Sequence, residues 1–175
     1  MYYPMHSTAY YCCVTGGSFT DVSCMGYKSG PSVIEEGNAY GNEFGSEIAL
    51  MRTSKGGSAR MMVAWDIQGW AAGEIGRNFG TEGSFDRVFN GSEKAKEILK
   101  NLKPQLKKPQ LPPGVEAGGH GGSHGYLGND FVEAILQKRN PYCDIVSSLN
   151  MSVCGIIAHQ SALKGGELLK IPQYA

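Results

Sequence analysis

Three histidines in this sequence could support proton transfer or ligand binding. Two of them are His120 and His124, in the glycine-rich stretch 118–125 (Gly-Gly-His-Gly-Gly-Ser-His-Gly). Glycine permits positive φ angles and close approach of a ligand to the backbone. An imidazole can hydrogen-bond, exchange a proton or bind a metal. The two histidines are therefore candidate ligand-binding residues, together with those between them, Gly121, Gly122 and Ser123. The alternative is a flexible turn with two solvated imidazoles.

The other candidate is His6, near the start of a predicted helix over residues 5–15. Pro4 suits the first turn of this helix, and the pair Gly16-Gly17 suits its end. The helix macrodipole disfavours positive charge at an N-terminus, so the pattern predicts a neutral His6. A capping or packing role for His6 is the alternative.

The glycine-rich stretch leads into a second predicted helix, residues 126–139, in which Leu127, Phe131 and Ile135 recur at four-residue spacing. Free backbone N–H groups at such a helix start could hold an anionic or hydroxyl-rich ligand. A third helix is predicted over residues 145–163. His159 lies outside the apolar stripe of that helix, so we expect it at the surface or an interface.

Short runs bounded by turn residues predict strands at 19–27, 46–53, 59–68, 73–79, 84–89 and 168–171. The four central runs, from 46 to 89, are expected to form a meander. One face of this sheet must be covered, and the flanking helices are available to cover it. A further helix is expected at 92–102, followed by a semi-rigid loop at 103–117. Residues 28–45, before the four central runs, are rich in turn residues.

Composition bounds the function. The chain of 175 residues suits one domain and is 41% apolar, enough for a sizeable core. Sixteen basic residues balance sixteen acidic ones, so no basic excess suggests a nucleic-acid partner. No apolar run approaches the roughly 20 residues that span a bilayer, and no basic amphipathic helix suggests a membrane surface.

The five cysteines are an odd number and include no C-x-x-C pair. We expect reduced, mostly buried thiols, which favours a reducing compartment such as the cytoplasm. Any export signal of a longer protein would precede Met1, so the compartment stays open.

Several linked motifs resemble one enzyme family. They run from His120–His124 through Asp130-Phe131-Val132 and Arg139-Asn140-Pro141 to 158–163 (Ala-His-Gln-Ser-Ala-Leu), Gly165-Gly166-Glu167 and Ile171-Pro172. The opening Tyr3-Pro4-Met5-His6 and the central Gly80-Thr81-Glu82-Gly83-Ser84 agree with them. Together these motifs resemble the C-terminal part of the Gfo/Idh/MocA-type oxidoreductases.

The resemblance implies an α+β fold, with an open, mostly antiparallel sheet and helices packed on one face, as in dihydrodipicolinate-reductase-like domains. Residues 1–175 would form a single substrate-binding and oligomerisation domain. The N-terminal Rossmann domain that binds NAD or NADP would lie outside this chain, which has neither a dinucleotide fingerprint nor the family's Glu-Lys-Pro motif. The isolated chain would then bind no cofactor and have no redox activity.

The resemblance also implies a sugar-like substrate, with His6 and Tyr3 as proton-transfer candidates and the 120–124 residues binding hydroxyl groups. A homo-oligomer formed through the sheet is expected as well. Many family dehydrogenases carry Asp-x-x-x-His where this chain has Tyr2 four residues before His6, so the carboxylate that tunes the histidine would be missing.

Three alternatives remain open. The Tyr-Pro-x-His form is similar to the NAD-dependent glycosidases of the family, which would act on a glycoside with the same residues. The chain could also be a non-catalytic binding or oligomerisation module. A metal site formed by His6, His120 and His124 is a weaker idea, because no cysteine or carboxylate has matching spacing.

Overall fold

The computed structural model describes residues 3–28, 42–64, 74–81, 84–86 and 110–175. The chain divides into two compact units. The first unit is Met1–Val88 with Val146–Ala175, and the second is Phe89–Ile145. That one domain spans the whole chain stays a prediction. The expected helix at 92–102 lies outside the described residues. So do residues 29–41 of the predicted turn-rich segment and residues 103–109 of the predicted loop.

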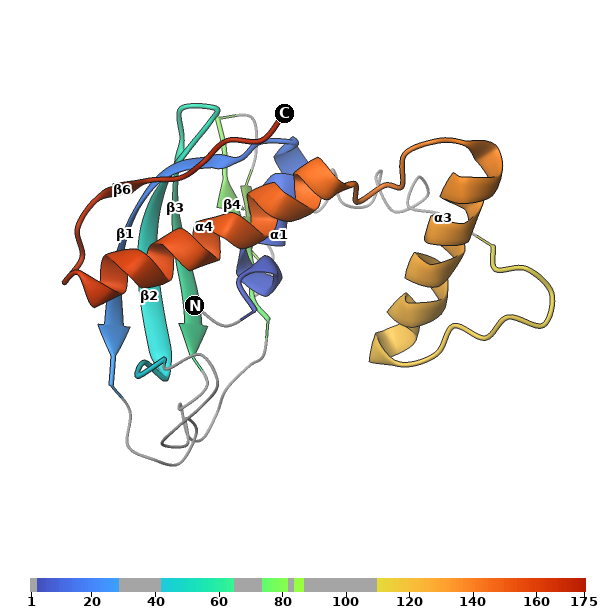
Figure 1. Ribbon diagram of the computed structural model, residues 1–175, viewed down its shortest axis with the longest axis horizontal. Helices are drawn as coiled ribbons and strands as arrows, with labels where there is room; N and C mark the ends of the chain where they lie inside the picture. Colours follow the sequence, from blue (N-terminus) through green and yellow to red (C-terminus); the bar gives the residue numbers. More distant parts are fainter. Residues whose placement is uncertain (1–2, 29–41, 65–73, 82–83, 87–109) are drawn as a thin grey trace. The chain divides into compact units, whose positions relative to one another are not determined.

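The first unit is built on a four-stranded sheet in the order β3-β2-β1-β6. Its strands are β1 (Phe19–Tyr27), β2 (Ser46–Thr53), β3 (Ser58–Ala64) and β6 (Leu169–Lys170). All three pairings are antiparallel. The helix α4 (Ile145–Leu163) runs across one face of the sheet (Figure 1). This agrees with the expected α+β class and the antiparallel sheet.

The core lies between α4 and the strands. Side chains alternate along a strand, so every second residue faces the helix. Val22 and Cys24 of β1 and Ala49 of β2 are fully buried there with Ala158 of α4. The outer face of the sheet instead carries exposed apolar side chains, from Met25, Ile48, Leu50 and Met62. The expected homo-oligomer through the sheet stays a prediction.

The C-terminal strand is held by an ion pair. Lys170 of β6 lies opposite Asp21 of β1, and their Nζ and Oδ1 atoms are 2.5 Å apart. This hydrogen bond from Lys170, with a second from Thr20, lowers the pKa of the Asp21 carboxyl below its ordinary value. The charged form of Asp21 therefore stabilises the pairing of β1 with β6.

The hydroxyl group of Thr8 joins the helix α1 (Met5–Thr15) to α4. The fully buried Thr8 Oγ1 lies 2.9 Å from the carbonyl oxygen of Met151 in α4 and 3.1 Å from that of Pro4. Near this bond, Gly155 of α4 faces the Pro4 ring so closely that a Cβ there would lie 2.2 Å from Pro4 Cβ. A glycine is therefore needed for α1 to begin where it does.

Four predicted elements are confirmed with their bounds, namely α1, β1, β2 and α4. The predicted four-stranded meander is wrong. Residues of β4 (Arg77–Phe79) and β5 (Ser84–Asp86) pair with each other in a separate two-stranded sheet. At β3, Ser7 of α1 donates a hydrogen bond to the Met62 carbonyl (3.1 Å). The helix α1, rather than a further strand, meets β3 at that point.

In the second unit, α3 (Ser123–Gln137) begins three residues before the predicted start. Just beyond its C-terminus, Arg139 donates a hydrogen bond to Asp130 (2.7 Å), and the Tyr142 backbone N–H donates another (2.9 Å). Both lower the pKa of the Asp130 carboxyl, the arginine more strongly. The apolar stripe at Leu127, Phe131 and Ile135 is exposed, so it predicted the helix but not a core.

The cysteines agree with the expected reduced, mostly buried thiols. None of the five, all of which lie in the described ranges, is in a disulfide: Cys12, Cys24 and Cys154 are buried, whereas Cys13 and Cys143 are exposed. Burial raises the pKa of Cys12 to about 11 and those of Cys24 and Cys154 to about 12. None of the helices in the described ranges is long and apolar enough to cross a membrane.

Candidate functional site

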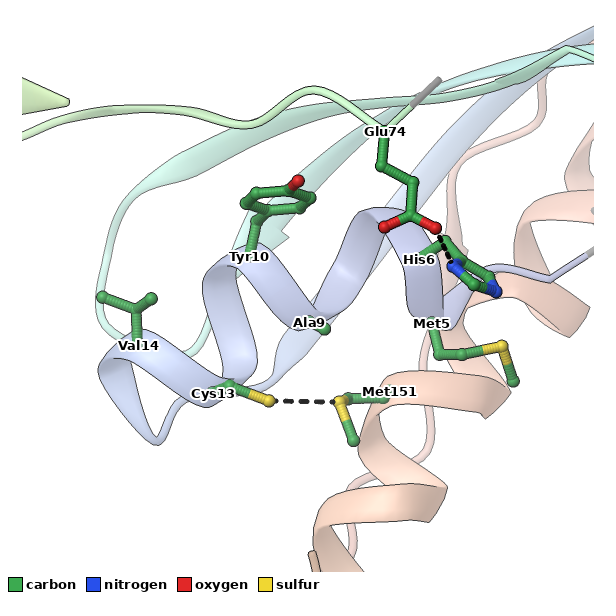
Figure 2. A pocket seen from close by; sticks show the side chains of 8 residues that line it. All are labelled: Met5, His6, Ala9, Tyr10, Cys13, Val14, Glu74 and Met151. Atoms are coloured by element: carbon green, nitrogen blue, oxygen red, sulfur yellow. Dashed lines mark hydrogen bonds and ion pairs between the residues drawn. The ribbon is translucent and has the colours of Figure 1, made fainter. Parts of the chain in front are cut away.

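His6 lies at a pocket of about 460 Å³ in the first unit (Figure 2). Its Nδ1 is 2.5 Å from a carboxylate oxygen of Glu74, and both side chains are at least half exposed. The pocket lies between α1, α4 and the segment before β4. Its walls are mostly apolar, and the lining residues are Met5, His6, Ala9, Tyr10, Cys13, Val14, Glu74 and Met151. An imidazole paired with a carboxylate at the edge of a pocket is an arrangement suited to proton transfer.

Close packing brings Glu74 to His6. Two residues after Glu74, Gly76 lies against the ring of Tyr10, one helical turn beyond His6. A Cβ at Gly76 would lie 2.0 Å from Tyr10 Cδ1, so only glycine fits here without displacement. The segment entering β4 therefore runs against α1, as the contacts between α1 and β4 also show.

This pair corrects one expectation. His6 was expected to lack a carboxylate partner, because no acidic residue stands four positions before it. The partner is instead 68 residues away in sequence. Local spacing cannot reveal such a partner, and nothing in the sequence around Glu74 except its charge pointed to it. That His6 is neutral stays a prediction.

Tyr3, the other predicted proton-transfer residue, is next to His6. Their ring centroids are 5.8 Å apart in an edge-to-face arrangement. The Tyr3 carbonyl accepts the His6 backbone N–H (3.2 Å). Tyr3 has a φ of 45° and precedes Pro4, which disfavours helical conformations in the preceding residue. A left-handed conformation of a bulky residue costs on the order of 1–2 kcal/mol. Strain of this kind gathers at functional sites.

His120 and His124 also lie together, in the second unit. Their ring centroids are 5.0 Å apart, and both residues are exposed. His120, Gly121 and Gly122 form a tight turn, and all three have positive φ angles. The predicted loop is wrong at its end, because Ser123 and His124 already belong to the first turn of α3. The structure brings His6 and Tyr3 together in the first unit, and separately His120 and His124 in the second.

The start of α3 is only partly open to a ligand. The backbone N–H of Gly125 donates to the Ala117 carbonyl (2.7 Å), and that of Gly122 donates to the Gly119 carbonyl (3.1 Å). A Cβ at Gly125 would lie 2.5 Å from the carbonyl oxygen of Glu116. At least one glycine of the stretch therefore serves the packing of segment 116–117 against the helix. Binding of hydroxyl groups by His120, Gly121, Gly122, Ser123 and His124 stays a prediction.

His159, expected at the surface or an interface, has a side chain that is 21% exposed. Its Nδ1 is 2.9 Å from a carboxylate oxygen of Glu47, whose side chain is 3% exposed. Phe44 meets the His159 ring edge to face at 5.9 Å. This pair crosses the interior between β2 and α4, and it therefore contributes to packing the helix on the sheet.

The described residues do not fit a nicotinamide dinucleotide. The glycine-rich stretch at 118–122 follows a segment, 110–117, that contains no strand, whereas the dinucleotide fingerprint lies between a strand and a helix. In the described ranges, no three His, Cys, Asp or Glu side chains gather in a way that could hold a metal ion. That this chain binds no cofactor of its own stays a prediction.

Comparisons with known proteins show likeness of structure. No protein-family profile matches the sequence, and no curated protein matches it either. An oxidoreductase domain protein from Kribbella flavida is similar in structure, with a TM-score of 0.58 and 17% sequence identity over 93% of this chain and 48% of that one.

Two further structures are similar over a comparable length. One is myo-inositol 2-dehydrogenase from Lactobacillus plantarum (TM-score 0.44, 16% identity, 92% of this chain and 44% of that one). The other is myo-inositol dehydrogenase from Lactobacillus casei, in complex with NAD(H) and myo-inositol (TM-score 0.42, 10% identity, 94% and 45%). The chain spans about half the length of each of these three structures. At these identities, the likeness to the Kribbella flavida protein establishes a shared fold.

Proposed function

We propose that this chain is the substrate-binding half of an NAD(P)-dependent oxidoreductase that acts on a sugar or sugar derivative, with His6 as its proton-transfer residue. The observation that carries the proposal is the His6–Glu74 pair at the edge of a pocket. The shared fold supports it, since the similar Kribbella flavida structure is described as an oxidoreductase domain protein. The motif resemblance to sugar-directed oxidoreductases points the same way.

The chemistry follows from what an imidazole can do. Oxidation of a secondary alcohol removes a hydride from carbon and a proton from the hydroxyl oxygen. A dinucleotide held by a domain outside this chain would supply the hydride acceptor. His6 accepts the hydroxyl proton. Tyr3, whose ring lies edge to face with that of His6, is the second candidate for proton transfer. General-base catalysis of this kind contributes typically 10²–10⁴-fold to the rate.

The experiment uses the complete product of the gene, read upstream of the codon for Met1. The purified protein is mixed with NAD or NADP and a panel of cyclitols and sugars, and formation of the reduced nicotinamide is followed by absorbance. We expect turnover with at least one polyol and none from the 175-residue chain alone. His6→Gln should lower kcat by roughly 10²–10⁴-fold, whereas His124→Ala should mainly raise KM.

Two results would count against the proposal. Absence of a dinucleotide-binding region in the complete gene product would favour a non-catalytic binding or oligomerisation module. Unchanged turnover in His6→Gln would remove His6 from the chemistry. His159→Gln is a useful control, because that histidine is away from the pocket lining and pairs with Glu47.

The NAD-dependent glycosidase is the second candidate, favoured by the contact between Tyr3 and His6 in the Tyr-Pro-x-His motif. Such an enzyme would release nitrophenol from a nitrophenyl glycoside only when NAD is present, with no net formation of NADH. Sugar-dependent NADH formation without nitrophenol release would favour the dehydrogenase.

A further inference from the structure

Glu74 is the acceptor of a proton on His6. An ionised carboxylate has no proton to donate. The 2.5 Å contact between Glu74 and Nδ1 of His6 therefore places the ring proton on Nδ1. The neutral ring then carries its lone pair on the other nitrogen, Nε2. The hydrogen bond at one nitrogen thus determines which nitrogen can act as a base.

The contact depends on more than one exposed side chain meeting another. Gly76 packs on the ring of Tyr10, and Tyr10 and His6 are one turn apart on α1. The backbone that carries Glu74 is thereby held against the same helix that carries His6. Apart from Glu74, the titratable groups among the described residues that touch the imidazole or line its pocket are Tyr3, Tyr10 and Cys13; the last two line the pocket. None of these three is an ionised carboxylate that could compete with Glu74 for the Nδ1 proton.

We propose that Glu74 is a positioning residue for His6: it fixes the proton on Nδ1, so that Nε2 is the atom that takes a proton from a substrate hydroxyl. The inference rests on the proposed function for its catalytic meaning, but not for the tautomer itself. When Nε2 takes the proton, the ring becomes a cation beside a carboxylate anion. Glu74 therefore also stabilises the product of the proton transfer.

The tautomer can be measured on the 175-residue chain without any cofactor. Histidine labelled with ¹⁵N gives separate nitrogen resonances for protonated and unprotonated ring atoms, read at about pH 9, where an ordinary imidazole is neutral. We expect Nδ1 of His6 to be protonated and Nε2 to be bare. In Glu74→Ala, the Nδ1-protonated population should fall severalfold. Glu74→Gln should retain part of it, because the amide oxygen still accepts a hydrogen bond.

Two further variants separate position from charge. Gly76→Ala keeps the Glu74 carboxylate but forces a Cβ into the Tyr10 ring, so it should reduce the Nδ1-protonated population as Glu74→Ala does. Glu167→Ala removes an exposed carboxylate that faces Lys164 and should leave His6 unchanged. A wild-type His6 that carries its proton on Nε2, or a Glu74→Ala spectrum like that of wild type, would overturn the inference.

Activity distinguishes failure of this inference from failure of the proposed function. In the complete enzyme, Glu74→Ala should lower kcat between about tenfold and 10⁴-fold, because the wrong tautomer presents the wrong nitrogen, with little change in KM. If the tautomer depends on Glu74 but no polyol is oxidised, the proposed function fails and the pairing stands. If polyols are oxidised and Glu74→Ala has wild-type kcat, the positioning role fails and the function stands.

Discussion

Replacing Gly155 by alanine tests a close contact between α4 and the start of α1. A Cβ at Gly155 would lie 2.2 Å from Cβ and 2.4 Å from Cγ of Pro4. Carbon atoms pack at about 3.5–4.0 Å, so the Pro4 ring would have to move by more than about 1 Å. Pro4 begins α1, and its carbonyl accepts the backbone N–H groups of Ser7 and Thr8 (2.9 Å each). The start of the helix would move with it.

Three contributions set the expected change in the free energy of unfolding. Alanine is favoured over glycine inside a helix by about 1 kcal/mol, which stabilises the variant. Overpacking costs typically 1–3 kcal/mol. Displacement of α1 also weakens the hydrogen bond from Thr8 to the Met151 carbonyl, worth about 0.5–1.5 kcal/mol. The costs exceed the gain, so we expect Gly155→Ala to be destabilised by about 1–3 kcal/mol.

Urea unfolding followed by circular dichroism measures this change, and the melting temperature should fall by roughly 2–4 °C per kcal/mol. Gly128→Ala is the matched control, since Gly128 lies inside α3 and a Cβ there meets no atom within 4 Å. That variant should gain up to about 1 kcal/mol within its own unit. If Gly155→Ala is stabilised as much as Gly128→Ala, α1 and α4 are not packed as described.

Three further outcomes are expected. A thiol reagent at about pH 8 should modify only Cys13 and Cys143 in the folded chain, and all five cysteines after denaturation; rapid labelling of a third thiol in the native chain would contradict the described burial. Lys170→Met should lower stability at neutral pH and approach wild-type stability in acid. The stability that Asp21 contributes through its lowered pKa is present above the ordinary carboxyl pKa and is lost as the pH falls through the pKa of Asp21 in the folded chain. An equal loss at every pH, read from urea unfolding, would refute this coupling between the ionisation of Asp21 and stability. The hydroxyl of Tyr11 is buried without a hydrogen-bond partner in the described part of the chain. Tyr11→Phe should therefore be neutral or stabilising by up to about 1 kcal/mol in the same assay. A clear loss of stability would show that the hydroxyl has a partner.

The motifs that carried the family resemblance turned out to serve the fold more visibly than the chemistry. Asp130 and Arg139 join the end of α3 to the chain after it. Ser161 is fully buried; its hydroxyl accepts a hydrogen bond from the backbone N–H of Cys24 and donates one to the Glu167 carbonyl. Gly166 has a φ of 93°, a conformation that favours glycine. Residues that serve the fold in this way can carry a family resemblance even when the substrate is not known.

Local patterns in the sequence were enough to predict several helices and strands of this protein. Periodicity, Pro4 and the Gly16-Gly17 pair gave the bounds of α1 and placed His6 in its first turn beside Tyr3. These features depend on residues a few positions apart, whose geometry is fixed by helix and turn stereochemistry.

Which distant segments contact one another could be seen in the tertiary structure but not in the sequence. It paired β4 with β5 instead of extending the sheet, and it brought Glu47 to His159 and Glu74 to His6. Such contacts arise where Gly76 packs on Tyr10, or where α4 covers the sheet. They depend on how whole elements fill space together, and a one-dimensional pattern does not contain that information because any carboxylate of the chain could have supplied the partner.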